Sequence, residues 1–347
     1  MEWLSASPAQ HGDDTEASGM PESTTIFDYD QPSVVCESDI LWLASMSVTI
    51  LYPLVLLLSL VGNGLVLWVL LKYENLEAFT NLFILNLCLS DLLFSSLLPV
   101  WITAYHRGWL LGDFFCKLLN MIFSVSLYSS IFFLTIMTIH RYLSVTRPLS
   151  TLGVQPLHRR ILVISTVWGA SLLSSIPDTI FHQEAASQCD YSETRAFLAS
   201  VYQHNAFFLL SMGVIVFCNV QILKALLRSR SKQRHRTVRL ILTVVVVYFL
   251  SWAPYNLILF LQTLLKLGVI QDCQVVHRLD VAVLVCRNLA FSQCCFNPVL
   301  YVFVGVKFRR HLKRLLRQMW QCRQQIASPG PLPHSPGAFL YEGPSFY

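Results

Sequence analysis

The sequence is poor in charge. Only 13% of its 347 residues are Asp, Glu, Lys or Arg, and 54% are hydrophobic, whereas soluble domains carry about 25% charged residues. The mean hydropathy is +0.53. This excess of apolar side chains excludes an ordinary soluble domain and is typical of a protein surrounded by lipid.

Lysine and arginine are absent from residues 1–71, although this segment holds nine acidic residues. Basic residues follow the first, third, fifth and seventh of the apolar runs described below. Cytoplasmic loops of membrane proteins are enriched in Lys and Arg, so we expect these segments to be cytoplasmic and the N-terminus to be extracellular. No nucleic-acid partner is expected.

Catalytic spacings are also lacking. Histidines and carboxylates are scattered along the chain, without the spacing of zinc ligands or of an activated nucleophile, and we do not expect an enzyme. Asn-x-Ser/Thr sequons do not occur, so N-glycosylation is not expected.

What the sequence does contain is seven continuous apolar runs of membrane-spanning length. They lie near 41–71, 78–104, 114–146, 160–181, 197–227, 237–266 and 279–304. In a helix, the stretch from Cys116 to Arg141 rises about 37 Å, which exceeds the roughly 30 Å of a bilayer core. Because the runs do not alternate, they disfavour a β-barrel. We expect an all-α bundle of seven transmembrane helices.

The segments outside the bundle have their own compositions. Residues 1–38 are acidic and rich in Ser and Pro, and we expect a disordered extracellular tail. The bundle takes up 39–304. Residues 305–322 place apolar side chains at helical spacing among Lys and Arg, which predicts an amphipathic helix on the membrane surface. Cys322 is a candidate lipidation site, and 323–347 is predicted to be a disordered cytoplasmic tail.

The spans carry characteristic residues or short motifs, and these marks occur in a known order along the chain. The marks are Asn63, Asp91, Cys116, His140-Arg141-Tyr142, Trp168, Trp252 with Pro254, and Asn297-Pro298 with Tyr301. In this order the chain resembles a rhodopsin-like (class A) G-protein-coupled receptor over about residues 36–322. Any one of these marks is weak evidence, but the ordered set is highly specific.

Within that class the chain resembles the chemokine receptors, and its sequence motifs are most similar to those of the lymphotactin (XC) type. The resemblance to chemokine receptors rests on the acidic N-terminus, on Cys36 and Cys273, and on the Cys294-Cys295 pair. The similarity to the XC type rests on Ser126-Leu127-Tyr128-Ser129-Ser130, His140-Arg141-Tyr142 and Pro336-Gly337-Ala338-Phe339. It implies a plasma-membrane receptor that binds a lymphotactin-type chemokine and activates inhibitory-class G proteins, raising calcium and driving chemotaxis. Arrestin is implied as a further partner.

Four cysteines lie on the expected outer side, where disulfides persist. The resemblance implies the pairs Cys116–Cys189 and Cys36–Cys273, whereas the sequence alone allows three pairings. Tyr29, between Asp28 and Asp30, is a candidate for sulfation and ligand capture. The alternative is a solvated acidic tail.

The resemblance also assigns roles to residues inside the bundle. Arg141, Tyr142 and Leu149 would contact the G protein. The activation switch would comprise Trp252, Pro254, Asn297, Pro298 and Tyr301. By position, the ligand pocket would be lined by Tyr52, Trp101, Phe123, Asp178, Tyr255 and Arg287.

Asp91, with Asn63, Ser130 and Asn297, resembles the buried sodium site of the class, and an oxygen-rich set suits a hard cation. The alternative is a purely structural polar network. No other cofactor is expected.

Several positions depart from the family pattern. His140 replaces the usual acid before Arg141, Asn219 replaces a tyrosine, and Arg287 replaces a glutamate. The first two keep open a scavenging receptor that binds chemokine without G-protein coupling. A transporter or channel would need inverted repeats, broken helices or several midplane charges, of which we identify only Asp91.

Overall fold

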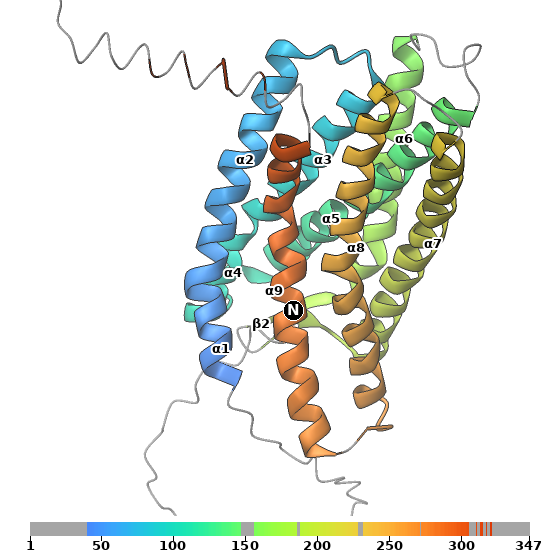
Figure 1. The fold of residues 1–347 in the computed structure, drawn as a ribbon. Helices are drawn as coiled ribbons and strands as arrows, with labels where there is room; N and C mark the ends of the chain where they lie inside the picture. The colour runs from blue at the N-terminus through green and yellow to red at the C-terminus, as the bar shows by residue number, and fades with distance from the viewer. Residues whose placement is uncertain are drawn as a thin grey trace, which may run out of the picture.

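The computed structural model describes residues 40–146, 156–185, 188–227, 232–270 and 272–304, together with Arg310, Lys313, Arg314, Arg317 and Trp320. Within these residues the chain is a helical bundle with one small hairpin (Figure 1). In order, its elements are α1 (Ile40–Met46), the π-helical segment η1 (Ser47–Leu51), α2 (Tyr52–Tyr73), α3 (Phe79–Ser96), α4 (Leu98–Arg107), α5 (Gly112–Thr146), α6 (Leu157–Ile180), β1 (His182–Ala185), β2 (Gln188–Tyr191), α7 (Thr194–Leu227), α8 (Lys232–Lys266) and α9 (Cys273–Val304).

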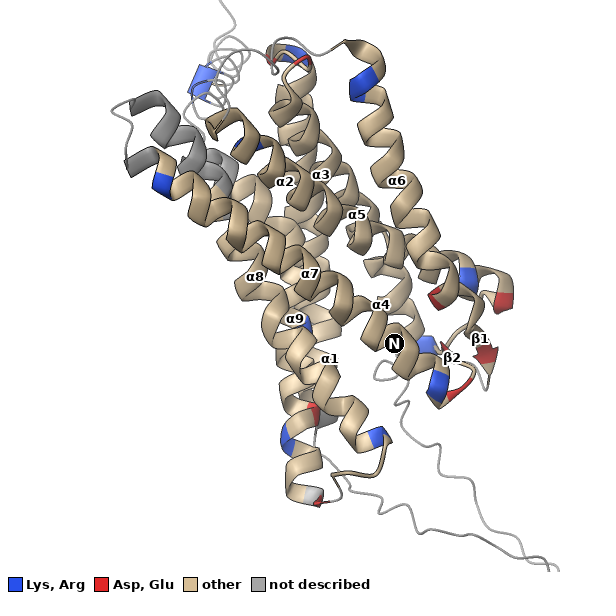
Figure 2. Cartoon of the chain, turned by 90° about the vertical axis from the view of Figure 1, so that its right-hand side faces the viewer, with Lys and Arg blue, Asp and Glu red and all other residues tan. Residues whose placement is uncertain are grey.

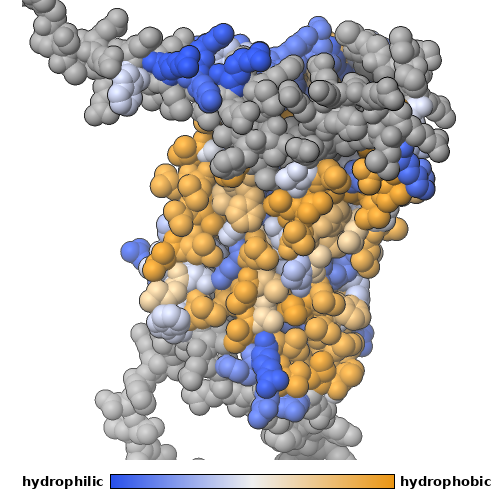
Figure 3. All heavy atoms as spheres, viewed as in Figure 1, coloured by the Kyte–Doolittle hydropathy of each residue, from blue (hydrophilic) through white to orange (hydrophobic). Residues whose placement is uncertain are grey.

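The expectation of seven membrane-spanning helices is confirmed. Seven helical stretches are long and apolar enough to cross a bilayer. They are Trp42–Tyr73, Phe79–Arg107, Gly112–Thr146, Leu157–Ile180, Thr194–Ala225, Val245–Lys266 and Gln274–Val299. The surface agrees, because the middle of the bundle is an apolar belt (Figure 3) and most Lys, Arg, Asp and Glu lie toward its two ends (Figure 2).

The belt is made of leucines and other apolar side chains that face away from the bundle. Leu57, Leu173 and Leu210 are 59%, 69% and 69% exposed. Residues of this size are normally buried in soluble proteins. In a membrane-spanning bundle, lipid covers such outward-facing apolar side chains instead.

Prolines shape the spans. The second span breaks at Leu97, which lies between the end of α3 and the start of α4, and Pro99 is in the first turn of α4. This agrees with the expected kink, because proline cannot donate the helical hydrogen bond and favours the first turn. Pro254 and Pro298 lie inside α8 and α9. A Cβ on Gly62 would lie 2.9 Å from the Pro298 side chain, so glycine permits the close approach of α2 and α9.

The third span, α5, is the centre of the bundle. It packs against α3, α6, α7 and α8 and also against β1. Strands β1 and β2 pair antiparallel, with Glu184 opposite Cys189. We call the end of the bundle that bears this hairpin the hairpin end, and the opposite end of α5 the Arg141 end. The sequence did not predict the hairpin.

Some expectations lie outside the described residues. The tails 1–38 and 323–347, Leu149 and Cys322 are among them, as are most of 305–322. The described positions of that last segment are helical and exposed, and they are Arg310, Lys313, Arg314, Arg317 and Trp320. The eighth helix stays a prediction.

Candidate functional site

The hairpin is tied to α5 at the hairpin end. A disulfide joins Cys116 to Cys189 of β2, with the two Cα atoms 5.6 Å apart, as the family resemblance implies. The backbone N–H of Glu184 donates to the Asp113 carboxylate at 3.1 Å. The second pair implied, Cys36–Cys273, falls on side chains outside the described residues.

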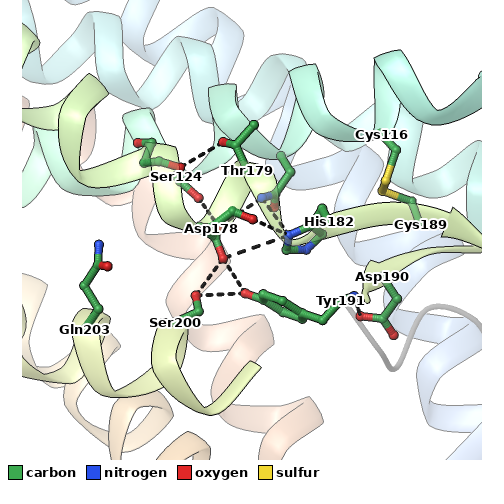
Figure 4. Close-up of polar contacts among 12 residues, drawn as sticks. Cys116, Ser124, Asp178, Thr179, His182, Cys189, Asp190, Tyr191, Ser200 and Gln203 are labelled. Atoms are coloured by element: carbon green, nitrogen blue, oxygen red, sulfur yellow. Dashed lines mark hydrogen bonds and ion pairs between the residues drawn. A yellow bond between two sulfur atoms is a disulfide. The ribbon is translucent and has the colours of Figure 1, made fainter. Parts of the chain in front are cut away.

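Beneath the hairpin lies a buried carboxylate, Asp178, near the end of α6 (Figure 4). One of its oxygens accepts from Asn120 at 3.0 Å and from Ser124 at 2.5 Å. The other accepts from Tyr191 at 2.5 Å and from Ser200 at 2.6 Å. Four donors from α5, β2 and α7 therefore converge on a single side chain of α6.

His182 and Tyr191 extend this network onto the hairpin. Nδ1 of His182 lies 2.8 Å from the carbonyl oxygen of Asp178, and the His182 ring is 99% buried. Burial lowers the pKa of the His182 imidazole, against the opposing effect of the Asp178 carboxylate. Burial and the Asp178 charge raise the pKa of the Tyr191 phenol well above its usual value, so Tyr191 remains a donor.

The four aromatic residues predicted for the ligand pocket do meet, around a ring that the sequence did not single out. Ring centroids of Tyr52, Trp101, Phe123 and Tyr255 lie 6.1, 5.4, 6.1 and 6.4 Å from that of Phe291 in α9. Stacked and edge-on rings at these separations form a rigid apolar surface.

The two charged residues predicted for the pocket differ in their surroundings. The oxygens of Asp178 are occupied by the network above. Arg287, one turn before Phe291, is 6% exposed. Its Nε and Nη2 have no hydrogen-bond partner among the described residues.

Deeper in the bundle, Asp91 links α3 to α9. The Asn297 amide donates to its carboxylate at 2.8 Å, and the Asn63 amide donates to the Cys294 carbonyl at 2.8 Å. The side-chain carbonyl oxygens of Asn63 and Asn297 are buried and have no partner among the residues that the structure describes. Ser130 donates to Ser126 within α5 at 2.9 Å.

A small cavity adjoins Asp91. Its lining includes Ser126, Ser130, Trp252 and Phe291. Asn63 and Asn297 do not line this cavity, but the Asp91 carboxylate and the two serine hydroxyls of its lining are hard oxygen donors of the kind that a small cation prefers. These residues therefore fit a sodium ion. Within the described part of the chain, no three His, Cys, Asp or Glu residues group as metal ligands.

The Arg141 end has a different arrangement. Nη2 of Arg141 donates to the Thr80 hydroxyl at 2.7 Å, and no carboxylate among the described residues lies within 4 Å of it. His140 packs between aromatic rings, with centroids 5.0 Å from Phe79 and 6.1 Å from Phe83. The Arg141 side chain is thus held by a neutral hydroxyl. In the family pattern an acid, at the position of His140, would pair with it.

The remaining switch residues lie along α8 and α9. The Trp252 ring packs against Tyr248, His204 and Tyr255, and its indole N–H has no partner among the residues described. Tyr142 packs edge-on to Phe217. The side chain of Tyr301 is outside the described part, as are Asp28, Tyr29 and Asp30.

Sequence reasoning missed Thr80, His182, Tyr191, Ser200 and Phe291. Tyr191 follows Cys189 by two residues, and alternate residues of a strand share a face, but this relation becomes a signal only once the strand is known. The others depend on which helices pack together.

Comparisons with known proteins agree with this geometry. The family model "7 transmembrane receptor (rhodopsin family)" matches residues 62–301. Human "Chemokine XC receptor 1" is 68% identical over 332 residues, which cover 96% of this chain and 100% of that protein. The mouse protein of the same name is 64% identical over 94% of this chain and 100% of its own length. Mouse "Atypical chemokine receptor 2" is 36% identical, covering 90% of this chain and 86% of that protein.

These matches cover most of the chain and include the span marks described above. They show a receptor family rather than an enzyme family, in agreement with the expectation from the sequence, and a multi-pass protein of the plasma membrane. The chain therefore belongs to the rhodopsin family of seven-transmembrane receptors and, within it, to the chemokine receptors of the XC type.

Proposed function

We propose that this receptor binds a lymphotactin-type (XC) chemokine at the hairpin end and activates heterotrimeric G proteins of the inhibitory class, which raise intracellular calcium and drive chemotaxis. The ligand class is supported by the two XC receptors that are 68% and 64% identical to this chain. The N-terminus and the hairpin end would be extracellular. Support comes from the absence of Lys and Arg before Lys72 and from the disulfide, which needs an oxidising compartment.

Binding would take place in two steps. The acidic tail 1–38, with Asp28, Tyr29 and Asp30, captures a basic chemokine core by electrostatic steering. The flexible N-terminus of the chemokine then enters between the helices and meets the aromatic surface around Phe291. Ligand contact favours a second packing of the bundle, in which α8 swings outward about Pro254. This is a shift in population between two states.

The observation that carries the coupling step is the restraint on Arg141. Within the described ranges, one hydroxyl, that of Thr80, accepts from the guanidinium. A hydrogen bond to a charged group contributes about 1.5–3 kcal/mol. This is less than the stability lost when one partner of a buried ion pair is removed. Arg141 can therefore be released at modest cost and offered, with Tyr142 and Leu149, to the C-terminal helix of a G protein α subunit.

Asp91, Asn63, Ser130 and Asn297 would hold a sodium ion, which supplies positive charge beside the Asp91 carboxylate. The bond between Asn297 and Asp91 joins α9 to α3, so a change at this site would act on the switch residues Pro298 and Tyr301. The proposal also includes a surface helix at 305–322, with Cys322 as its lipid anchor. It further includes a cytoplasmic tail at 323–347 that would bind arrestin.

Cells that express the receptor test the proposal when they are exposed to a panel of chemokines. We expect the XC-type chemokine alone to raise calcium and to lower forskolin-stimulated cAMP. A calcium response without lowered cAMP would contradict the inhibitory class.

A second candidate is a scavenging receptor that takes up chemokine without coupling. It is favoured by two departures from the family pattern, His140 in place of an acid and Asn219 in place of a tyrosine. Uptake of labelled chemokine without calcium or cAMP change would establish it in place of the first.

A further inference from the structure

Arg287 is a buried charge in an unusual position. It lies about halfway along the last span, Gln274–Val299, and is 6% exposed. Its Nε and Nη2 are buried and have no hydrogen-bond partner within the described residues. An unpaired ion in such a place costs several kcal/mol. Ionisable residues inside spans are therefore expected to serve a function, and a partner must be sought.

The described part of the bundle supplies no such partner. No described carboxylate lies within 4 Å of Arg287. Asp280 shares its face of α9, but seven residues separate the two, which is about 10.5 Å along a helix axis. Asp91 is bonded to Asn297, and Asp178 accepts from four other donors.

The surroundings of Arg287 add a second free donor. The rings of Tyr52 and Tyr255 lie 6.1 and 6.4 Å from that of Phe291, one turn after Arg287. The Tyr52 hydroxyl is buried and without a partner among the described groups. Among the described residues, this cluster thus offers donors and positive charge with no carboxylate paired to them.

We propose that Arg287, assisted by the Tyr52 hydroxyl, is a subsite for the carboxylate of an acidic side chain carried by the flexible N-terminal segment of the peptide ligand. The inference rests on the proposed function and adds to it the chemical class that this part of the pocket selects.

The chemistry of the guanidinium favours this occupant. Its planar fork of N–H donors matches the two oxygens of a carboxylate, and the aromatic surface around Phe291 excludes the water that would screen the pair. A cationic group, including the α-amine of a ligand, is repelled. The pocket therefore selects an acidic ligand segment, whereas a glutamate at this position would select a basic one.

Charge removal at Arg287 provides the test. Membranes carrying wild-type receptor, Arg287→Gln, Arg287→Lys or the control Arg278→Gln are compared for binding of the recombinant XC-type chemokine. Arg278 lies on the same helix and is exposed. The chemokine is also prepared with each Asp and Glu before its first cysteine changed singly to the amide. Thermal unfolding of the unliganded, detergent-solubilised receptors is measured in chloride and again in gluconate.

We expect Arg287→Gln to weaken binding about thirty-fold or more, the usual effect of removing one partner of a buried charge pair. Arg287→Lys should lose less, and Arg278→Gln nothing. One amide-substituted chemokine should bind wild type as weakly as Arg287→Gln binds the natural chemokine, with no further loss when the two changes are combined. The unfolding temperature of unliganded Arg287→Gln should be unchanged or higher, because no internal partner is lost.

Three results would overturn the inference. Arg287→Gln could bind the chemokine like wild type. Its unliganded unfolding temperature could fall below that of Arg278→Gln, which would give Arg287 a structural role. Chloride could stabilise wild type but not Arg287→Gln, with no effect of the ligand's acids, which would assign the subsite to a free anion. If wild type binds no XC-type chemokine, the proposed function fails and the inference fails with it.

Discussion

Removal of one hydroxyl at the hairpin end tests how the hairpin is held over the bundle. In Tyr191→Phe the ring stays, but the donor to Asp178 at 2.5 Å is lost. Hydrogen bonds to charged groups contribute about 1.5–3 kcal/mol. Asp178 keeps three other donors, so we expect a loss near the lower value, about 1.5 kcal/mol.

Two measurements report this loss. The unfolding temperature of the solubilised receptor should fall by up to a few degrees, since about 1 kcal/mol shifts it by roughly 2–4 °C in chains of about 150–250 residues and by less in a longer chain. If the ligand binds beneath the hairpin as proposed, chemokine should also dissociate up to about tenfold faster, because 1.4 kcal/mol corresponds to a factor of ten.

Tyr202→Phe is the matched control. The Tyr202 hydroxyl lies 3.4 Å from Thr263 and the residue is 42% exposed, so its loss should change stability by less than about 0.5 kcal/mol. Combined with Asp178→Asn, Tyr191→Phe should cost less than the sum of the two single changes, because the residues share a contact. Equal unfolding temperatures for Tyr191→Phe and Tyr202→Phe would refute the role given to this network.

Three further predictions concern other parts of the chain. Burial lowers the pKa of His182 in the folded state, so below its ordinary pKa of about 6.5 the unfolded state binds more protons. Stability should therefore fall as the pH drops below that value. In unfolding scans at pH 7.5 and 5.5, His182→Asn should reduce this fall. Cys116→Ala should abolish surface expression or chemokine binding, seen by flow cytometry, whereas full binding at normal surface level would contradict the role of the disulfide. His140→Asp should lower basal nucleotide exchange at matched surface density by supplying a charge partner to Arg141, and unchanged basal exchange would argue against that partnership.

The fold was largely predictable because lipid imposes one solution on long apolar runs. Each span must satisfy its own backbone hydrogen bonds, so seven runs predict seven helices. The break before Pro99 follows from proline chemistry. The β1–β2 hairpin was not predictable, because its residues, such as His182 and Glu184, show no apolar alternation, and the pairing depends on the tether from Cys189 to Cys116.

Site residues were predictable only where a residue type is energetically unfavourable at its position, such as a charged side chain inside a membrane span. Asp91 stood out as an acid within a span, and the structure places Asn297 beside it. The partners of Asp178 are ordinary serines, an asparagine and a tyrosine, which converge only once α5, α6 and α7 pack. Thr80 likewise gains meaning only because the Arg141 side chain reaches α3.

The central claim is that the receptor couples to G protein through Arg141, although no carboxylate lies beside it in the described structure. Chemokine-stimulated binding of GTPγS to membranes of matched receptor density measures this directly. We expect clear stimulation of wild type, and none of Arg141→Ala, with chemokine binding retained in both. Chemokine binding without stimulated exchange in wild type would contradict the account and leave the scavenging receptor in its place.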